Sequence, residues 1–134
     1  MFKITPIQDK ARQKEICEMC GTTLREDFFA YIMYDCDTLE VMGMSQFEIG
    51  ESGLIADLRE PEGCSDTEAM FILGRQTMCF IESCGARICY AERDAGDPRL
   101  LHAIGFRDVG ERLSCDMTGM FDGHCGGHTV DTAE

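Results

Sequence analysis

Three consecutive segments decide the fold: Leu54-Ile-Ala-Asp-Leu-Arg59, Asp66-Thr-Glu-Ala-Met-Phe-Ile-Leu-Gly-Arg-Gln-Thr-Met-Cys-Phe-Ile-Glu-Ser-Cys84 and Ala86-Arg-Ile-Cys-Tyr-Ala91. The first and third are short apolar runs that predict buried strands. The second is predicted to be a helix because its apolar residues recur at helical spacing, at Met70, Leu73, Thr77, Phe80, Ile81 and Cys84. A strand, a crossover helix and a following strand predict a right-handed βαβ unit with two parallel strands.

The residues before this unit predict an antiparallel meander. Strands are expected at 28–34, 40–49 and 54–59, and Gly50-Glu-Ser-Gly53 is typical of the turn in a hairpin. A first strand at 2–5 precedes a helix at 10–20, which Asp9 caps and Gly21 ends. The chain is therefore expected to form an α/β (α+β) fold with one mixed sheet.

The residues around the central unit carry start and stop signals for helices. Pro61-Glu-Gly63 breaks the preceding strand, and either Ser65 or Asp66 is expected to cap the long helix. Ser65 with Glu68 fits a capping box. Pro98 predicts the start of a short helix that ends at Gly105, and two final strands are expected at 106–109 and 113–117.

Length and charge limit what the chain does. Its 134 residues suit one domain at 1–120, followed by a Gly- and His-containing flexible tail at 121–134. The start shows no signal-peptide pattern and no apolar run spans a membrane, so a cytoplasmic location is expected. A net charge of -13 disfavours nucleic acid and anionic membranes as partners and favours a cationic small molecule or peptide.

The nine cysteines are odd in number and irregularly spaced, which does not fit a disulfide framework. Cys79, Cys84 and Cys89 stand among apolar residues and are expected in the core. Free thiols in a reducing compartment are therefore predicted.

Several stretches resemble the GNAT N-acetyltransferase superfamily. Residues 30–45 look like its second and third strands, 53–59 like its fourth, and 85–92 like the end of its long helix and its fifth strand. Leu100-Leu-His-Ala-Ile-Gly-Phe-Arg-Asp-Val-Gly110 looks like its ending, a short helix running into Gly-Phe. The resemblance covers residues 2–120 and implies an acyl-CoA N-acyltransferase fold with an antiparallel meander and a central βαβ unit.

The resemblance also implies acetyl-CoA as donor and an amine as acceptor. In such a site the amide groups of the splayed fourth strand orient the donor, and the start of the long helix receives its pyrophosphate. The cofactor-binding positions implied in this chain are Ile55, Ala56, Asp57, Leu58, Asp66, Thr67, Glu68 and Ala69.

The loop that should bind the pyrophosphate departs from the family's glycine-rich pattern. Glu60-Pro-Glu-Gly-Cys-Ser-Asp-Thr-Glu-Ala69 has one glycine, four acids and no Lys or Arg. Asp66 would place a carboxylate where the helix end favours an anion, so a phosphate would meet repulsion. The alternative to a phosphate loop is a well-capped helix, and weak or absent CoA binding is predicted.

Catalytic candidates come from two places. Glu48 and Asp57 are candidate general bases on the third and fourth strands, and Gln46 is a candidate to position a water molecule. The family's proton-donating Tyr is replaced by Leu101, which leaves the neighbouring His102 as the candidate acid. The alternatives are a solvated Glu48 and a surface His102.

Two Cys/His groups suggest metal binding, and both have simpler explanations. Cys17-Glu-Met-Cys20 needs two further ligands to hold zinc and otherwise ends a helix. His124-Cys-Gly-Gly-His128 is able to chelate a metal and otherwise belongs to a disordered tail. No metal site is therefore assigned.

Three functions stay open from the sequence. One is an N-acetyltransferase that acts on a small-molecule or peptide amine. The second is a catalytically inactive binding or interaction module of the same fold that has lost CoA binding. The third is a metal-responsive protein that uses the Cys/His tail. A homodimer is compatible with the first two.

Overall fold

The structure, a computed structural model, describes residues 1–121 and contains one mixed sheet and three helices. The strands stand in the order β1-β2-β3-β4-β5-β7-β6. Their bounds are β1 Phe2–Pro6, β2 Phe29–Asp35, β3 Val41–Ile49, β4 Gly53–Arg59, β5 Ile88–Ala91, β6 Arg107–Asp108 and β7 Leu113–Asp116. The helices are α1 Lys10–Met19, α2 Thr67–Ser83 and α3 Pro98–Ile104.

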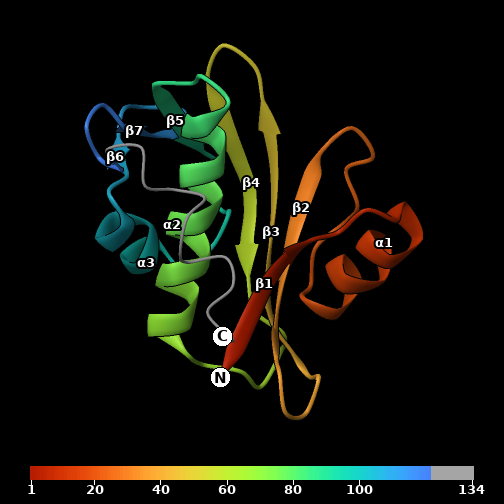
Figure 1. Cartoon of the computed structure of the whole chain (residues 1–134). Helices are drawn as coiled ribbons and strands as arrows, with labels where there is room; N and C mark the ends of the chain where they lie inside the picture. The colour runs from red at the N-terminus through yellow and green to blue at the C-terminus, as the bar shows by residue number, and fades with distance from the viewer. Residues whose placement is uncertain (122–134) are drawn as a thin grey trace.

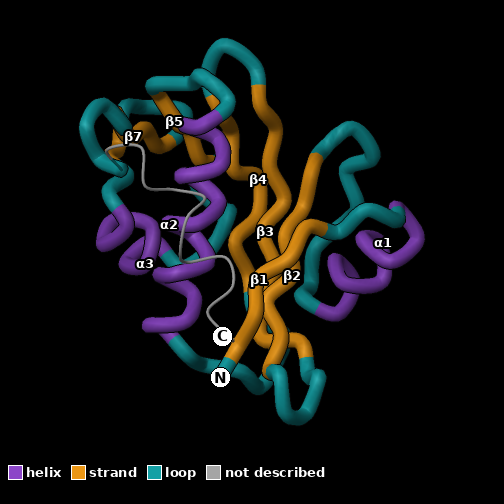
Figure 2. Tube along the Cα trace, viewed as in Figure 1, coloured by secondary structure: helices purple, strands orange, loops and turns teal. Residues whose placement is uncertain are grey.

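The strand pairing confirms the predicted topology. β1 to β4 pair antiparallel in sequence order, and Figure 2 shows the short loops that join β2 to β3 and β3 to β4. β4 then pairs parallel with β5, with Gly53–Ile55 opposite Cys89–Ala91. The crossover between these two parallel strands runs through α2, as the periodicity of residues 66–84 predicts.

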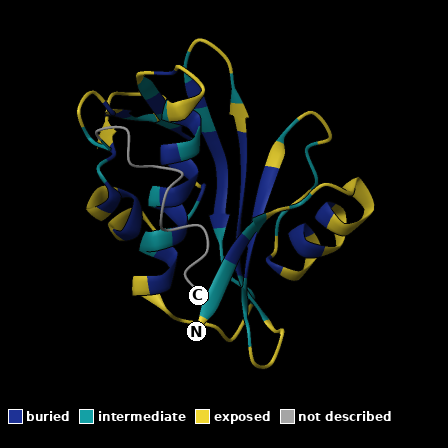
Figure 3. Ribbon diagram, in the orientation of Figure 1, coloured by how far each residue is buried: buried dark blue, intermediate teal, exposed yellow. Residues whose placement is uncertain are grey.

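The helices cover both faces of the sheet (Figure 1). α2 and α3 lie on one face and bury the larger apolar core, and α1 lies on the other face. The smaller core beneath α1 consists of Ile16, Cys17, Cys20, Ile32 and Met44. Figure 3 shows the buried residues concentrated in the central strands and on the inward sides of the helices.

Helix α2 confirms the predicted apolar stripe and shows which of the two predicted residues caps it. Met70 and Leu73 are fully buried, and half-buried Phe80 contacts Tyr31 on β2. The side chain of Asp66 accepts a hydrogen bond from the Ala69 amide at 3.0 Å, so Asp66 caps the helix and the Ser65 capping box is not formed. An aspartate caps without help from a partner side chain, because its carboxylate accepts the free amides of the first turn directly.

The shorter helices begin and end where the sequence predicts. Asp9 caps α1 and Asp97 caps α3, with Pro98 in its first turn. Gly21 follows α1 with φ of 78°, and Gly105 follows α3 with φ of 136°. These positive φ values suit glycine, which has no Cβ to oppose them.

The cysteines follow the predicted burial with one exception. Cys79 and Cys89 are buried, whereas Cys84 is exposed because it caps the C-terminus of α2 and points out of the helix–sheet interface. Free thiols among the described residues are Cys17, Cys20, Cys36, Cys64, Cys84, Cys89 and Cys115. Cys79 is disulfide-bonded, so the prediction that the cysteines are free thiols is wrong for this residue. Within residues 1–121, no helix is both long enough and apolar enough to cross a membrane.

The burial of α2 generates a stability prediction. Leu73→Ala removes a fully buried side chain from the larger core and should lower the free energy of unfolding by about 3 kcal/mol. Val109→Ala truncates an apolar side chain that is 60% exposed and should change it by less than about 0.5 kcal/mol. Urea unfolding followed by circular dichroism measures both, and equal effects would contradict the assignment of this core.

Candidate functional site

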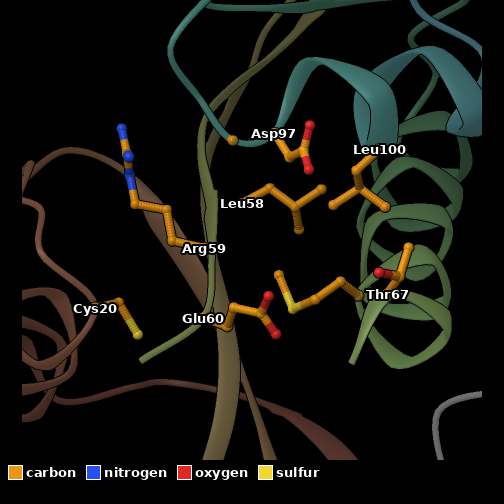
Figure 4. A pocket seen from close by; sticks show the side chains of 9 residues that line it. Cys20, Leu58, Arg59, Glu60, Thr67, Asp97 and Leu100 are labelled. Atoms are coloured by element: carbon orange, nitrogen blue, oxygen red, sulfur yellow. The ribbon is translucent and has the colours of Figure 1, made fainter. Parts of the chain in front are cut away.

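A pocket of about 250 Å³ lies at the end of β4, between the first turn of α2 and the start of α3. Figure 4 shows Leu58, Thr67 and Leu100 on the α2 and α3 side of β4, whereas Arg59 and Cys20 lie on the α1 side. The other lining residues are Glu60, Met70, Gly96 and Asp97. We call this the β4 pocket.

A bulge in β4 determines which side chains face this pocket. Gln46 on β3 stands opposite Asp57, but the next residue, Phe47, stands opposite Ile55, so Ala56 is the extra residue. A bulge exchanges the faces on which the following side chains lie. Leu58 therefore reaches the core beneath α2, and Asp57 turns toward α1.

Gln46 and Asp57 are the centre of a buried polar network under α1. The Gln46 amide donates to Asp57 Oδ2 at 2.7 Å, and both side chains are almost completely inaccessible to solvent. Gln46 Oε1 accepts from the Gln13 side chain at 2.9 Å and from the Arg25 backbone amide at 2.8 Å. The Cys17 thiol lies 3.6 Å from the same oxygen. The network thus joins α1, β3, β4 and the connection after α1.

The other oxygen of the Asp57 carboxylate also has hydrogen-bond partners. Asp57 Oδ1 accepts from the Thr22 hydroxyl at 2.8 Å and from Arg59 Nε at 2.6 Å. A buried carboxylate needs this kind of pairing, because desolvation without partners costs several kcal/mol. Asp57 is a predicted base and cofactor-binding position, but its oxygens are engaged with Gln46, Thr22 and Arg59.

The opening between β4 and β5 is filled by the chain itself. Parallel pairing stops at Ile55, whose carbonyl accepts the Glu92 amide at 3.1 Å. Beyond this point the Leu58 amide donates to the Ala95 carbonyl at 2.7 Å, and Ala95 is fully buried. A Cβ at Gly96 would overlap the Leu58 carbonyl, so this position requires glycine. We call Glu92–Asp97 the plug segment.

Two arginines hold the plug segment in place. Arg25 makes a two-point ion pair with Glu92, with N–O distances of 3.0 Å and 2.8 Å. This hydrogen bond is the main cause that raises the pKa of Arg25. Arg59 donates to the Asp94 carbonyl at 2.6 Å while its Nε contacts Asp57. The guanidinium of Arg59 is therefore turned away from the β4 pocket, as Figure 4 shows.

The N-terminus of α2 carries negative charge. Asp66 occupies the capping position, and its own amide donates to Glu60 Oε2 at 3.1 Å. Glu68 adds a carboxylate in the first turn. Two amides at this helix end, those of Asp66 and Ala69, are therefore already bonded to carboxylates of the chain, and the negative charge there opposes a further anion.

These residues do not fit the CoA group that the sequence resemblance implies. The Leu58 amide, one of the expected donor-orienting groups, is bonded to Ala95, and the expected pyrophosphate site holds Asp66 and Glu68. Thr67 lines the β4 pocket, and the Ala69 amide is used by the cap. Ala56 is the bulge residue, and Ile55 gives its carbonyl to Glu92.

The two predicted catalytic residues lie away from this pocket. Glu48 is exposed on β3 opposite Leu54. His102 is exposed on α3, where its Nδ1 lies 3.4 Å from Arg107, and the buried neighbour Leu101 faces the core. The structure therefore brings neither residue together with Asp57.

The Cys17–Cys20 pair lies at the end of α1 among apolar residues. Burial is the main cause that raises the pKa of the Cys17 thiol to about 11 and that of Cys20 to about 12. No group of three potential metal ligands occurs within residues 1–121. The His124–His128 candidate lies outside the described residues.

Sequence reasoning did not predict that the connection after α1 bonds to Gln46 and Asp57. Thr22, Thr23 and Arg25 all bond to the network, Thr23 through its carbonyl to the Gln46 amide at 3.1 Å. The signal available in the sequence was the polar Gln46 in an otherwise apolar strand, since a buried amide needs several partners.

Known structures share this arrangement of elements. An IAA acetyltransferase from Bacillus cereus ATCC 14579 superposes with a TM-score of 0.72 over 87% of this chain and 99% of its own, at 12% identity. The chain has the GNAT fold. The ribosomal-protein-S18-alanine N-acetyltransferase from Escherichia coli superposes with a TM-score of 0.64 over 85% of this chain and 90% of its own, at 10% identity.

A third structure with the GNAT fold contains the cofactor. It is described as a streptothricin acetyltransferase from Bacillus anthracis in complex with acetyl coenzyme A, and it superposes with a TM-score of 0.54. The match covers 67% of this chain and 60% of the other, at 10% identity. No protein-family model matches the chain, and a search of curated protein sequences gives no match.

The buried network generates a second stability prediction. Asp57→Ala leaves Arg59, Thr22 and the Gln46 amide without their acceptor and should lower the free energy of unfolding by about 3 kcal/mol. Asp37→Ala at an exposed turn serves as control and should have an effect below about 0.5 kcal/mol. Guanidinium unfolding measures both effects. If Asp57→Ala left the free energy of unfolding unchanged, this would contradict a structural role for the network.

The raised thiol pKa values predict a pattern of reactivity and of pH dependence. At pH 8, Cys64 and Cys84 should react with iodoacetamide, while Cys17 and Cys20 should be protected by burial and by their low thiolate fraction. In the unfolded chain both thiols ionise near the ordinary value of 9.0, so their contribution to stability is complete below pH 9 and is lost between pH 9 and 12. Mass spectrometry of alkylated peptides checks the first statement, and equal rates at all four thiols would refute it.

Proposed function

We propose that the chain is a non-catalytic binding module with the GNAT fold, which has lost CoA binding and takes a small cationic amine in the β4 pocket. The observation that carries the proposal is the hydrogen bond from the Leu58 amide to the Ala95 carbonyl. A β-strand amide in the opening between β4 and β5 needs an acceptor. In this chain the plug segment supplies that acceptor, so a ligand does not have to.

The charge at the β4 pocket supports a cation. Glu60 and Asp97 line the pocket, while its one basic residue, Arg59, is bonded to Asp57 and to the Asp94 carbonyl. The apolar part of the lining comes from Leu58, Met70 and Leu100 and suits the carbon chain of an amine. The net charge of -13 adds a long-range attraction for a cation.

The alternative function is an N-acetyltransferase that uses acetyl-CoA. The divergence of β4 from β5 after Ile55 and the bulge at Ala56 favour it, since β5 itself does not pair with β4 beyond Ile55. Acetyltransferases also share the fold. The alternative requires the plug segment to move and the α2 N-terminus to accept a polyanion despite Glu60, Asp66 and Glu68.

Calorimetric titration with acetyl-CoA separates the two functions. At physiological salt we expect no binding tighter than about 1 mM, because the site repels phosphate. Asp66→Asn combined with Glu68→Gln should improve binding several-fold, and more so at low salt, because Asn retains the capping ability while the charge is lost. Micromolar binding by the unaltered chain would overturn the proposal.

A titration with spermidine tests the cation site. Glu60→Gln with Asp97→Asn should weaken binding roughly ten-fold, since each removes a carboxylate of the β4 pocket and Asn still caps α3. Asp37→Asn with Glu111→Gln removes the same charge elsewhere and is the matched control. Equal losses in both variants would show that spermidine only screens the general negative charge.

A further inference from the structure

A second pocket, of about 490 Å³, lies where β1 leads into α1, beside the first residues of β2 and the last turns of α2. Four aromatic side chains line it, together with Ile7 and Lys10: Phe29, Tyr31, Phe47 and Phe80. It shares no lining residue with the β4 pocket. Its volume falls within the range of small-molecule sites, about 300 to 1,000 Å³. We call it the aromatic pocket.

The four rings form a floor and a wall. Tyr31 stacks on Phe47 with an interplanar angle of 25° and centroids 5.5 Å apart, and Phe29 lies 6.0 Å from Phe47 at 38°. Phe80 stands nearly perpendicular to both Tyr31 and Phe47, at 79° and 76°. A planar ring in such a corner stacks on Phe29, the exposed ring of the floor, and meets the half-buried Phe80 edge to face, which are the two geometries that aromatic pairs prefer.

Burial shows which parts of the corner are fixed. Tyr31 and Phe47 are almost fully buried, and the Tyr31 side chain is hydrogen-bonded to Gln76, so its hydroxyl does not need a ligand. Phe29, the first residue of β2, is 55% exposed. The corner is thus rigid on its inner side and has an open apolar ring on its outer side, which a ligand would cover.

Lys10 is the only charged residue that lines this pocket. Its ammonium donates to the Phe28 carbonyl at 2.5 Å and to Gln13 Oε1 at 3.1 Å. These bonds hold the ammonium next to Phe29 and use two of its three N–H groups. The third is left for an acceptor at the mouth of the pocket, and no carboxylate of the lining competes for it.

We propose that the aromatic pocket binds a small planar aromatic carboxylate, whose ring fills the corner and whose carboxylate pairs with Lys10. The net charge of -13 opposes an anion at long range, but salt screens charges beyond about 8 Å, so the adjacent Lys10 determines the local preference. An aromatic cation could contact the ring faces, but it would meet the Lys10 ammonium and find no carboxylate in the lining. The proposal does not depend on the function of the β4 pocket.

Titration of the full chain with benzoate tests this assignment by NMR of the backbone amides. Benzoate should shift the amides of residues 7–10 and 29–31 with a dissociation constant on the order of 1 mM, as expected for a fragment of this size. Benzyltrimethylammonium should not shift them in the same range. Cyclohexanecarboxylate, which keeps the charge and loses the flat ring, should bind about five-fold more weakly.

Two variants separate the ring from the charge. Phe29→Ala should weaken benzoate about five-fold, and Val109→Ala, which alters an equally exposed apolar residue elsewhere, should not. Lys10→Met keeps the apolar stem and should weaken benzoate about five-fold while leaving the neutral benzyl alcohol unchanged. Circular dichroism of each variant confirms that the fold is retained.

Three outcomes would overturn the assignment. One is the absence of shifts at residues 7–10 and 29–31 at 20-fold the expected dissociation constant, that is, on the order of 20 mM benzoate. The second is tighter binding of benzyltrimethylammonium than of benzoate, which would indicate a cation site. The third is an equal loss of benzoate and benzyl alcohol in Lys10→Met, which would show that the ammonium only shapes the pocket.

Discussion

The buried hydrogen bond between Gln46 and Asp57 is the interaction on which the arrangement of this end of the molecule depends. It brings an amide and a carboxylate together under α1, where neither is stable alone. The hydrogen-bonding groups that this pair leaves unused need further partners. These partners are Gln13 from α1, Thr22 and Arg25 from the connection after α1, and Arg59 from β4 itself. Arg25 and Arg59 in turn hold the plug segment at Glu92 and Asp94.

The plug segment follows from a second constraint, the need to satisfy the backbone of β4. A strand that diverges from its parallel neighbour leaves amide and carbonyl groups without partners, and these need either a ligand or another part of the chain. Here Glu92 and Ala95 take both roles, at Ile55 and at Leu58. The absence of a side chain at Gly96 allows this close approach, since any Cβ there would overlap the Leu58 carbonyl. The GNAT fold is thus complete at this edge without a cofactor.

The fold could be predicted from local patterns because its elements have strong signals of their own. The period of Met70 and Leu73, the cap at Asp9, the proline at the start of α3 and the turn at 50–53 each fix an element without knowledge of the others. The site could not be predicted as far. Its key feature is the bulge at Ala56, which no residue type marks and which exchanges the faces on which Asp57 and Leu58 lie.

The choice between the two predicted caps of α2 depends on the tertiary structure, as the details of the site do. Ser65 and Asp66 are both good caps, and only the path of the chain from Glu60 decides between them, through the bond of Glu60 to the Asp66 amide. Likewise, Glu48 and Gln46 lie on the same face of β3, yet one is solvated and the other buried, because α1 extends over Gln46 only. Alternation predicts the face of a strand residue but not what covers it.

The two pockets differ in how their local charge compares with the net negative charge of the chain. The β4 pocket adds carboxylates to an acidic protein and has its one arginine committed to Asp57, so its preference for a cation agrees with the overall field. The aromatic pocket has only Lys10 and lies beside the last turns of α2, whereas the β4 pocket lies at the first turn. The intervening length of α2 exceeds the screening length in physiological salt, so each pocket responds to its own side chains and not to the other.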